Sequence, residues 1–216
     1  MVKVKVCGIT NLDDALAASE AGADALGFNF YARSPRYLTL AEARRIVAEM
    51  PASVLCIGVF VNEDHPAVVE RMAGEAGLSA VQLHGDEPPD YCAALGRLKV
   101  IKALRVGEDF APAAATRYPV TSVLLDAFHA RARGGTGETF DWALARRTRE
   151  LVPQLYLAGG LTPENVEGAI AAVSPYAVDV CSGVELAPGR KDAARVRAFV
   201  AAVRRGEKNL DAEPPA

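Results

Sequence analysis

A cysteine ends the first apolar segment of the chain, in the run KVCGIT at residues 5–10. If residues 2–6 form a strand, alternation places Lys5 and Cys7 on one face and the neighbouring valines on the other. An ammonium group beside a thiol lowers the thiol pKa and raises the fraction of thiolate. Most cysteines are buried and inert, but a side chain at the carboxyl end of a barrel strand faces the active site. Cys7 is therefore a candidate base or nucleophile, with Lys5 either activating it or serving only as a salt-bridged interior residue.

A carboxylate ends another apolar segment, where Asp126 follows the run SVLL. Partial desolvation favours the protonated carboxyl group, which is the form that a general acid needs near neutral pH. The structural alternative is an aspartate that caps a loop or pairs with a nearby arginine. In a closed barrel, a sixth strand ending at Asp126 lies three strands from the first, so Asp126 and Cys7 face each other across the mouth. An acid and a base on opposite sides of a bound molecule are arranged to move protons.

Two glycine-containing segments, AGGLT at residues 158–162 and CSGVE at residues 181–185, follow the last two expected strands. Barrels often bind phosphate at these two strand ends through backbone N–H groups, and glycine lets the backbone approach the anion. Either segment alone is typical of an ordinary turn. Together they predict a phosphate site at four residues: Gly159, Gly160, Ser182 and Gly183.

The segment NFYARSPRY at residues 29–37 carries Arg33 and Arg36 beside aromatic residues, which suits an aromatic carboxylate. An exposed loop arginine is more often only solvated. The run GGTG at residues 134–137 is not a nucleotide-binding loop, because no Lys-Ser or Lys-Thr pair follows it, and we interpret it as a lid. The three histidines, one of them His84, are too scattered for a helical metal motif, so no metal site is expected.

Short apolar runs alternate with helical patterns along the whole chain, which is typical of parallel strands covered on both faces. The expected strands are residues 2–6, 25–28, 54–61, 80–83, 100–104, 123–125, 155–158 and 177–180. This rhythm predicts an α/β fold, a single-domain (β/α)8 TIM barrel over residues 1–205. An open doubly wound sheet is the alternative, but it usually has a GxGxxG turn after its first strand, which this chain lacks.

Three local features qualify this pattern. The fifth helical segment is the weakest, because Pro112 lies inside it. The pair Thr162-Pro163 is typical of a helix start, with Thr162 as the capping residue. The last residues, 206–216, are polar with a proline pair, and we expect them to form a disordered tail.

The 216 residues carry a net charge of −3 without a basic run, which argues against a nucleic-acid partner. No apolar run approaches the ~18 residues that a membrane span needs, and no signal peptide precedes the first strand. The four cysteines lack metal-type spacing and are interpreted as thiols in a reducing compartment. We therefore expect a cytoplasmic protein that takes a small phosphorylated molecule, as a monomer or a homodimer.

Motifs spread from Val4 to about Val203 resemble those of the phosphoribosylanthranilate isomerases, a family of tryptophan biosynthesis. In chain order the motifs are KVCGIT, SPRY, GVFVN, QLHGDE, LDA, GGTG, AGGLTPENV and SGVE. The resemblance implies a cofactor-free Amadori rearrangement of N-(5′-phosphoribosyl)anthranilate to 1-(2-carboxyphenylamino)-1-deoxyribulose 5-phosphate. No cofactor is therefore expected.

The resemblance also implies roles for single residues. Asp126 would be the general acid, Cys7 the general base, and Arg36 the residue that holds the anthranilate carboxylate. The four residues of the two glycine segments would bind the phosphate. The supporting residues would be Lys5, Gln82, His84, Gly135 and Asp179.

One position departs from the family pattern, since Cys181 stands where the family commonly has serine. Strand alternation places Cys181 and Asp179 on one face of the eighth strand, next to the first strand of a closed barrel. We expect Lys5 and Asp179 to form a buried pair, because each would otherwise be a costly lone charge. We also expect Cys7 and Cys181 to lie close enough for a disulfide under oxidation.

Three other functions remain open at this stage. One is a related aminoaldose isomerase of histidine biosynthesis, or a barrel that takes both substrates. The resemblance implies a pair of aspartates for such enzymes, and Cys7 at the position of the base argues against them. A metal-dependent sugar-phosphate epimerase would lose activity on chelation. A non-catalytic phosphate-binding protein would not depend on Cys7 and Asp126 for turnover.

Overall fold

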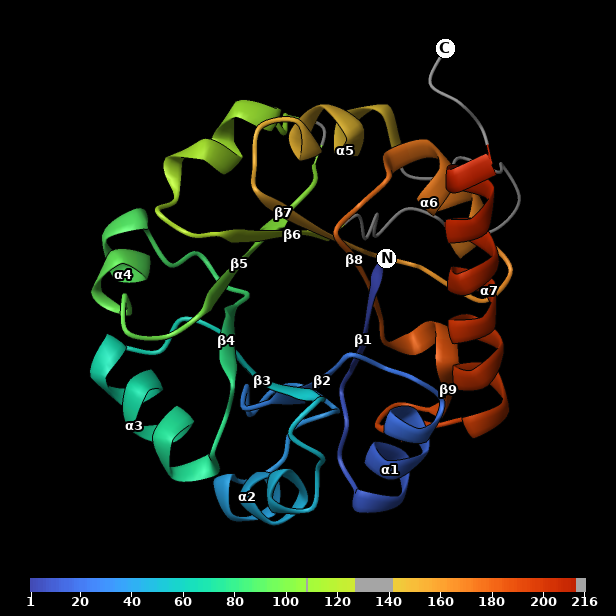
Figure 1. The fold of residues 1–216 in the computed structure, drawn as a ribbon. Coiled ribbons are helices and arrows are strands. Elements are labelled where there is room, and N and C mark those ends of the chain that lie inside the picture. The colour runs from blue at the N-terminus through green and yellow to red at the C-terminus, as the bar shows by residue number, and fades with distance from the viewer. Residues whose placement is uncertain (108, 127–141, 213–216) are drawn as a thin grey trace.

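The computed structural model describes residues 1–107, 109–126 and 142–212, with side chains described as far as residue 210. Within these ranges eight parallel strands form a closed barrel in sequence order, because β8 pairs with β1 (Figure 1). The strands are β1 (Lys3–Cys7), β2 (Ala25–Asn29), β3 (Leu55–Phe60), β4 (Ala80–Leu83), β5 (Val100–Arg105), β6 (Ser122–Asp126), β7 (Gln154–Ala158) and β8 (Ala177–Val180). The predicted barrel is confirmed, with strand bounds that differ from the expected ones by a residue or two.

Helices surround the barrel and cover the outer faces of its strands (Figure 1). They are α1 (Leu12–Glu20), α2 (Leu40–Ala48), α3 (Pro66–Ala76), α4 (Pro89–Ala94), α5 (Trp142–Arg149), α6 (Val166–Val173) and α7 (Ala193–Ala212). The segment between β5 and β6 forms only a 3₁₀ helix, η1 (Pro112–Arg117), as expected of a segment with a proline in it. After β8 come a short 3₁₀ turn, η2 (Ser182–Val184), and a hairpin of β9 (Glu185–Ala187) and β10 (Arg190–Lys191).

Side-chain caps mark the starts of α1 and α2. Asn11 accepts a hydrogen bond from the Asp14 N–H and so caps α1. Thr39 and Glu42 form a reciprocal capping box at α2. The prediction at Thr162 is confirmed in part. Its hydroxyl accepts from the Glu164 N–H at 3.2 Å and its carbonyl oxygen accepts from the Val166 N–H, as a capping residue does, but α6 itself begins at Val166 and residues 163–165 form turns. Asn165 also accepts from the Thr162 N–H, which closes these turns before the helix.

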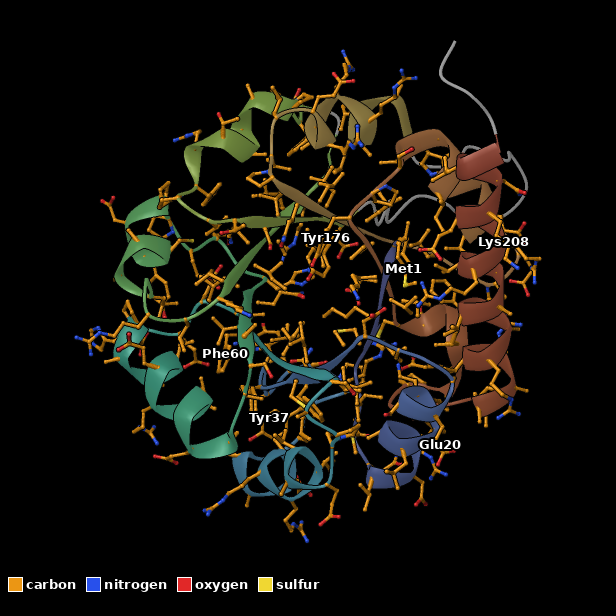
Figure 2. The ribbon with its side chains drawn as sticks, in the orientation of Figure 1. Met1, Glu20, Tyr37, Phe60, Tyr176 and Lys208 are labelled. Carbon is orange, nitrogen blue, oxygen red and sulfur yellow. The ribbon has the colours of Figure 1, made fainter. Side chains whose placement is uncertain are left out.

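Side chains fill the barrel and the layer around it (Figure 2). Val4 and Val6 of β1 belong to the core between strands and helices, and both are fully buried. A smaller core inside the barrel includes Ile57, Leu124 and Tyr156. The alternation predicted for β1 is confirmed, because its valines face the helices while Lys5 faces the interior. No helix of the described residues is long and apolar enough to span a membrane.

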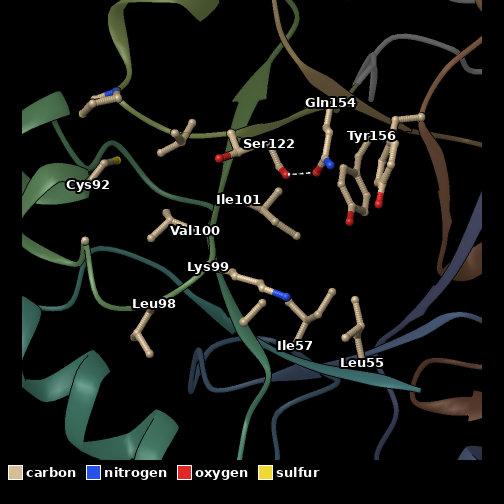
Figure 3. A pocket seen from close by; sticks show the side chains of 16 residues that line it. Leu55, Ile57, Cys92, Leu98, Lys99, Val100, Ile101, Ser122, Gln154 and Tyr156 are labelled. Atoms are coloured by element: carbon tan, nitrogen blue, oxygen red, sulfur yellow. Dashed lines mark hydrogen bonds between the residues drawn. The ribbon is translucent and has the colours of Figure 1, made fainter. Parts of the chain in front are cut away.

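The amino-terminal mouth of the barrel contains a cavity of about 380 Å³ (Figure 3). Leu55, Val100, Ser122 and Gln154, each the first residue of its strand, line it. The Ser122 hydroxyl donates to Oε1 of Gln154 at 2.7 Å, which ties β6 to β7 at this end. The cavity therefore lies at the end of the barrel away from Cys7 and Asp126.

The predicted disordered tail is wrong for residues 206–212, because α7 continues through Ala212. Gly206 is buried, and a Cβ added there would lie 3.3 Å from Cδ1 of Ile170, so the helix crosses α6 closely at this point. The Glu207 carboxylate accepts from the Val2 N–H and from Arg204, while Lys208 lies on the exposed side of the helix (Figure 2). Polar composition misled the prediction, since the contacts that order this segment are tertiary. Residues 213–216 lie outside the described residues.

Truncation after Arg205 is expected to destabilise the fold. It removes the close helix crossing, the Glu207 hydrogen bonds and the packing of Leu210 against the core. We expect a loss of about 1–3 kcal/mol, or a few degrees in Tm for a chain of this length. Thermal unfolding measures it, and truncation after Ala212 is the matched control because it keeps the whole helix. Equal Tm values for the two truncations would contradict the structure of this segment.

Candidate active site

The carboxyl ends of the strands converge on a cavity of about 440 Å³. Predicted site residues that line it are Cys7, Arg36, Gln82, His84, Asp126, Gly159, Gly160, Asp179 and Ser182. Lys5 is fully buried in the barrel interior, and Arg33 is exposed. Gly135 and the predicted lid at residues 134–137 lie outside the described residues. The barrel therefore gathers, at one mouth, side chains that are far apart in the sequence.

Lys5 is a buried positive charge beneath this cavity. Its Nζ lies 3.0 Å from Oδ1 of Asp179, and the two side chains are 0% and 7% exposed. Burial disfavours the ammonium, but the charges of Asp179 and Cys7 outweigh it and raise the pKa of Lys5 above its ordinary value. Burial also raises the pKa of Asp179 to about 7, although Lys5 acts in the opposite direction. The predicted buried pair is present, and the register that aligns Lys5 with Asp179 produces it.

Cys7 lies above this pair at the end of β1. A hydrogen bond from Cys181 is the largest cause that holds the pKa of Cys7 well below its usual range. Burial opposes the lowering, while Lys5 and Lys191 add to it. A Cβ at Gly27 of β2 would lie 2.7 Å from the Cys7 sulfur and 3.2 Å from Nζ of Lys5, so this position must lack a side chain. The strand neighbours thus lower the pKa of the Cys7 thiol and leave space for its sulfur.

Asp126 ends β6, on the other side of the cavity. One of its oxygens, Oδ2, lies 3.1 Å from Nε2 of His84. The other ring nitrogen of His84, Nδ1, lies 2.7 Å from the Gln82 side-chain nitrogen. If the amide nitrogen donates to Nδ1, then Nε2 carries the hydrogen and donates to Asp126. Gln82 and His84, both predicted to be supporting residues, therefore orient the Asp126 carboxyl group.

A buried ion pair holds the loop that carries His84. Nζ of Lys102 lies 2.6 Å from Oε2 of Glu87 and donates to the Gly85 carbonyl oxygen at 2.7 Å. The Glu87 carboxylate also accepts from the N–H of Gly85 and from the N–H of Asn62 in the loop after β3. Two loops at the mouth are thereby fixed to β5 through one lysine.

Arg36 reaches the cavity from the loop after β2. Its Nε and Nη2 donate to the two oxygens of Glu185 at 2.8 and 2.6 Å, a bidentate pair. Nζ of Lys191 lies 2.8 Å from Oε1 of the same carboxylate, and the Lys191 side chain is 1% exposed. Two cations share one anion, so the cluster keeps a net positive charge. The remaining N–H groups of the Arg36 guanidinium can face a substrate carboxylate.

The two glycine segments meet at the mouth. A Cβ at Gly183 would lie 2.0 Å from the Leu161 carbonyl oxygen, so the loops after β7 and β8 touch only because this residue is glycine. Asn165 donates to the Gly160 carbonyl oxygen, and Arg195 donates to that of Gly183, at 3.0 and 2.9 Å. These contacts fix both loops beside the cavity, with backbone that an anion can approach.

Sequence reasoning gave no role to four charged residues that shape the site. They are Glu87, Lys102, Glu185 and Lys191. Both glutamates lie in motifs named above, QLHGDE and SGVE, but the sequence does not show which buried side chains pair with them. Nothing in the sequence singles out the two lysines, because only the fold brings each to its carboxylate. Among the described residues, no group of three His, Cys, Asp or Glu side chains is placed to hold a metal ion.

Comparison with known proteins agrees with this arrangement. A family model for N-(5′-phosphoribosyl)anthranilate (PRA) isomerase matches residues 4–202. The chain is 54% identical over 200 residues to the N-(5′-phosphoribosyl)anthranilate isomerase of Geobacter sulfurreducens, covering 93% of this chain and 97% of the relative. It is 48% identical over 201 residues to that of Thermotoga neapolitana, again covering 93% and 97%.

Solved structures give the same result. The phosphoribosyl anthranilate isomerase of Thermotoga maritima superposes with a TM-score of 0.86 at 46% identity, covering 95% of this chain and all of that one. A phosphoribosyl anthranilate isomerase in complex with reduced 1-(o-carboxyphenylamino)-1-deoxyribulose 5-phosphate superposes with a TM-score of 0.84 at 44% identity, with the same coverage. The chain belongs to the family of N-(5′-phosphoribosyl)anthranilate isomerases.

Proposed function

We propose that this chain converts N-(5′-phosphoribosyl)anthranilate into 1-(2-carboxyphenylamino)-1-deoxyribulose 5-phosphate, with Cys7 as general base and Asp126 as general acid. The observation that carries this proposal is the placement of the two groups. Cys7 ends β1, Asp126 ends β6, and both line one cavity beside an arginine and two glycine loops. The complex of a relative with a reduced product analogue supports a phosphorylated small-molecule ligand for the family.

Asp126 acts first, on the ribose ring. Its carboxyl group gives a proton to the ring oxygen, and the bond between that oxygen and C1′ breaks. The nitrogen of the anthranilate forms a double bond to C1′, which leaves an open-chain protonated Schiff base. His84 orients the carboxyl group for this transfer, through the 3.1 Å contact between Nε2 and Oδ2.

Cys7 acts second, at the neighbouring carbon. Its thiolate removes the C2′ proton, and the electron pair forms the C1′–C2′ double bond of an enolamine while the charge on nitrogen is neutralised. The enolamine gains a proton at C1′, and its hydroxyl group loses one to become the C2′ ketone. Because C2′ is oxidised and C1′ reduced within one molecule, the reaction draws on no external electron carrier.

Charged and backbone groups hold the two ends of the substrate. The free N–H groups of Arg36 bind the anthranilate carboxylate, and Lys191 compensates the charge of Glu185 so that Arg36 keeps its attraction for an anion. The backbone of Gly159, Gly160, Ser182 and Gly183 binds the phosphate. Two fixed ends leave the ribose between acid and base, which is the arrangement that general acid–base catalysis needs.

Location and assembly complete the proposal. We place the chain in the cytoplasm, acting as a monomer or a homodimer on a small molecule and not on nucleic acid. A Thermotoga maritima relative is described as dimeric.

The first test is loss of substrate fluorescence on addition of purified protein. Wild type should convert the substrate beyond its spontaneous hydrolysis, with the rearranged ketose as product and no effect of a metal chelator. Cys7→Ala and Asp126→Asn should each lower kcat/KM by about 10²–10⁴-fold, because each removes one proton transfer. Circular dichroism checks that the variants fold. If either variant turned over the substrate at the wild-type rate, the role assigned to that residue would be refuted. If the wild type preferred the histidine-pathway aminoaldose, the proposed substrate would be refuted.

A second test concerns Arg36. Arg36→Met should raise KM by about 10–100-fold with a smaller change in kcat, because it removes charged hydrogen bonds to the carboxylate. Arg36→Lys is the matched control, which keeps the charge but loses the bidentate fork, and its KM should lie between the two. An unchanged KM in Arg36→Met would exclude this residue from carboxylate binding.

A further inference from the structure

We propose that Gln82 is a positioning residue for the reaction, because its amide holds His84 in the tautomer that donates to Asp126 and cannot take the proton of Asp126. The proposal rests on Asp126 as the general acid. It gives Gln82 a stated task, which is to reserve the acidic proton for the substrate.

Strand β4 places the side chains of Gln82 and His84 on one face. Gln82 lies in β4 and His84 follows the strand directly, so alternation turns both side chains toward the barrel interior. Both residues line the candidate active-site cavity. The His84 N–H donates to the Phe60 carbonyl oxygen of β3 at 2.8 Å, which fixes the backbone that carries the imidazole.

The amide of Gln82 has one hydrogen-bonding arm in use and one without a partner. Gln82 is 0% exposed, and its Nε2 lies 2.7 Å from Nδ1 of His84. Its Oε1 is buried and has no hydrogen-bond partner among the described residues. The sheet neighbours of Gln82 are Val59 of β3 and Ile101 of β5, whose side chains carry no polar atoms. The second arm of the amide therefore lies in apolar surroundings.

The unpaired arm decides how the amide is turned. With oxygen in that position, one acceptor is left without a donor. With the NH₂ group in that position, two buried N–H hydrogens would be left without an acceptor. Buried donors without partners are the rarer case in proteins. Nε2 of Gln82 therefore faces His84 and donates to Nδ1.

This hydrogen bond determines the tautomer of His84. A neutral imidazole has one N–H group and one lone pair, and the Gln82 hydrogen occupies the lone pair at Nδ1. The ring hydrogen therefore resides on Nε2, which lies 3.1 Å from Oδ2 of Asp126 and donates to it. A hydrogen on Nδ1 would point at the Gln82 N–H, so His84 has no free site for a further proton.

The tautomer matters because a neutral imidazole is a stronger base than a carboxylate. A lone pair of His84 facing Asp126 would take the acidic proton and leave a carboxylate, which cannot protonate the ribose ring oxygen. With Nε2–H facing Oδ2, the proton resides on the other oxygen of Asp126 and passes to the substrate. The carboxylate that remains still accepts from His84 at Oδ2, so the same contact stabilises the result of the proton transfer.

The tautomer of His84 is measurable without activity. The nitrogen-15 chemical shifts of the ring, read from long-range proton–nitrogen correlation spectra, distinguish the Nε2–H, Nδ1–H and imidazolium forms. The chain has three histidines, so loss of signals in His84→Gln identifies those of His84. We expect the Nε2–H form in the wild-type protein.

Two variants of Gln82 should change that spectrum. Gln82→Glu places a group that accepts against Nδ1, so the ring should carry a hydrogen there and become imidazolium between two carboxylates. Its kcat should fall by about 10–100-fold with a smaller change in KM. Gln82→Met keeps a similar volume without the hydrogen bond, and both effects should be smaller. Gln154→Met is the matched control, because it removes a glutamine at the other mouth of the barrel, and it should change neither readout.

A wild-type His84 that carries its hydrogen on Nδ1, or that is imidazolium, overturns the proposal. So does an Nε2–H form that persists in both Gln82 variants, since Gln82 would then not set the tautomer. A changed tautomer with unchanged kcat overturns the role of Gln82 in the reaction. Failure of the general acid itself shows differently, as wild-type turnover by Asp126→Asn while the His84 spectrum of the wild-type protein stays as expected.

Discussion

The buried ammonium of Lys5 is the charge on which the mouth of the barrel depends. An unpaired charge in a protein interior costs several kcal/mol, so this position needs anionic partners close by. Asp179 on the adjoining strand provides one, at 3.0 Å, and Cys7 at the strand end provides the other when its thiol is ionised. A lysine placed inside a barrel thus helps to lower the pKa of the neighbouring cysteine, the residue proposed as the base, and the closure of β8 on β1 pairs that lysine with Asp179.

A second group of charged side chains connects Arg36 with Cys181. Arg36 and Lys191 both bind the Glu185 carboxylate, and Lys191 also contacts Cys181. The side chain proposed to bind the substrate carboxylate is therefore linked, through Glu185 and Lys191, to the sulfur of Cys181. On the acid side, Lys102 and Glu87 fix the loop of His84 in a similar way. An ion pair thus lies beside each of the two groups proposed to react.

Most of the fold was predictable because its determinants are local. Short apolar runs predict parallel strands covered on both faces, and alternation along β1 and β8 correctly paired Lys5 with Asp179. Helix α6 begins later than predicted and α7 extends further than predicted, because a contact of Asn165 in the preceding turns and the burial of Gly206 decide them. Lys191 was missed for the same reason: it lies on a two-residue strand that no periodicity marks, and only tertiary contacts give it a role.

The division of labour between Cys7 and Asp126 is tested most directly by substrate carrying deuterium at C2′. In Cys7→Ser, removal of the C2′ hydrogen should become rate-limiting, so the residual turnover should show a several-fold primary isotope effect. In Asp126→Asn, ring opening should limit the rate, and the isotope effect should be close to one. A large effect in Asp126→Asn together with none in Cys7→Ser would contradict the account, because it would assign removal of the C2′ proton to a group other than the Cys7 thiolate.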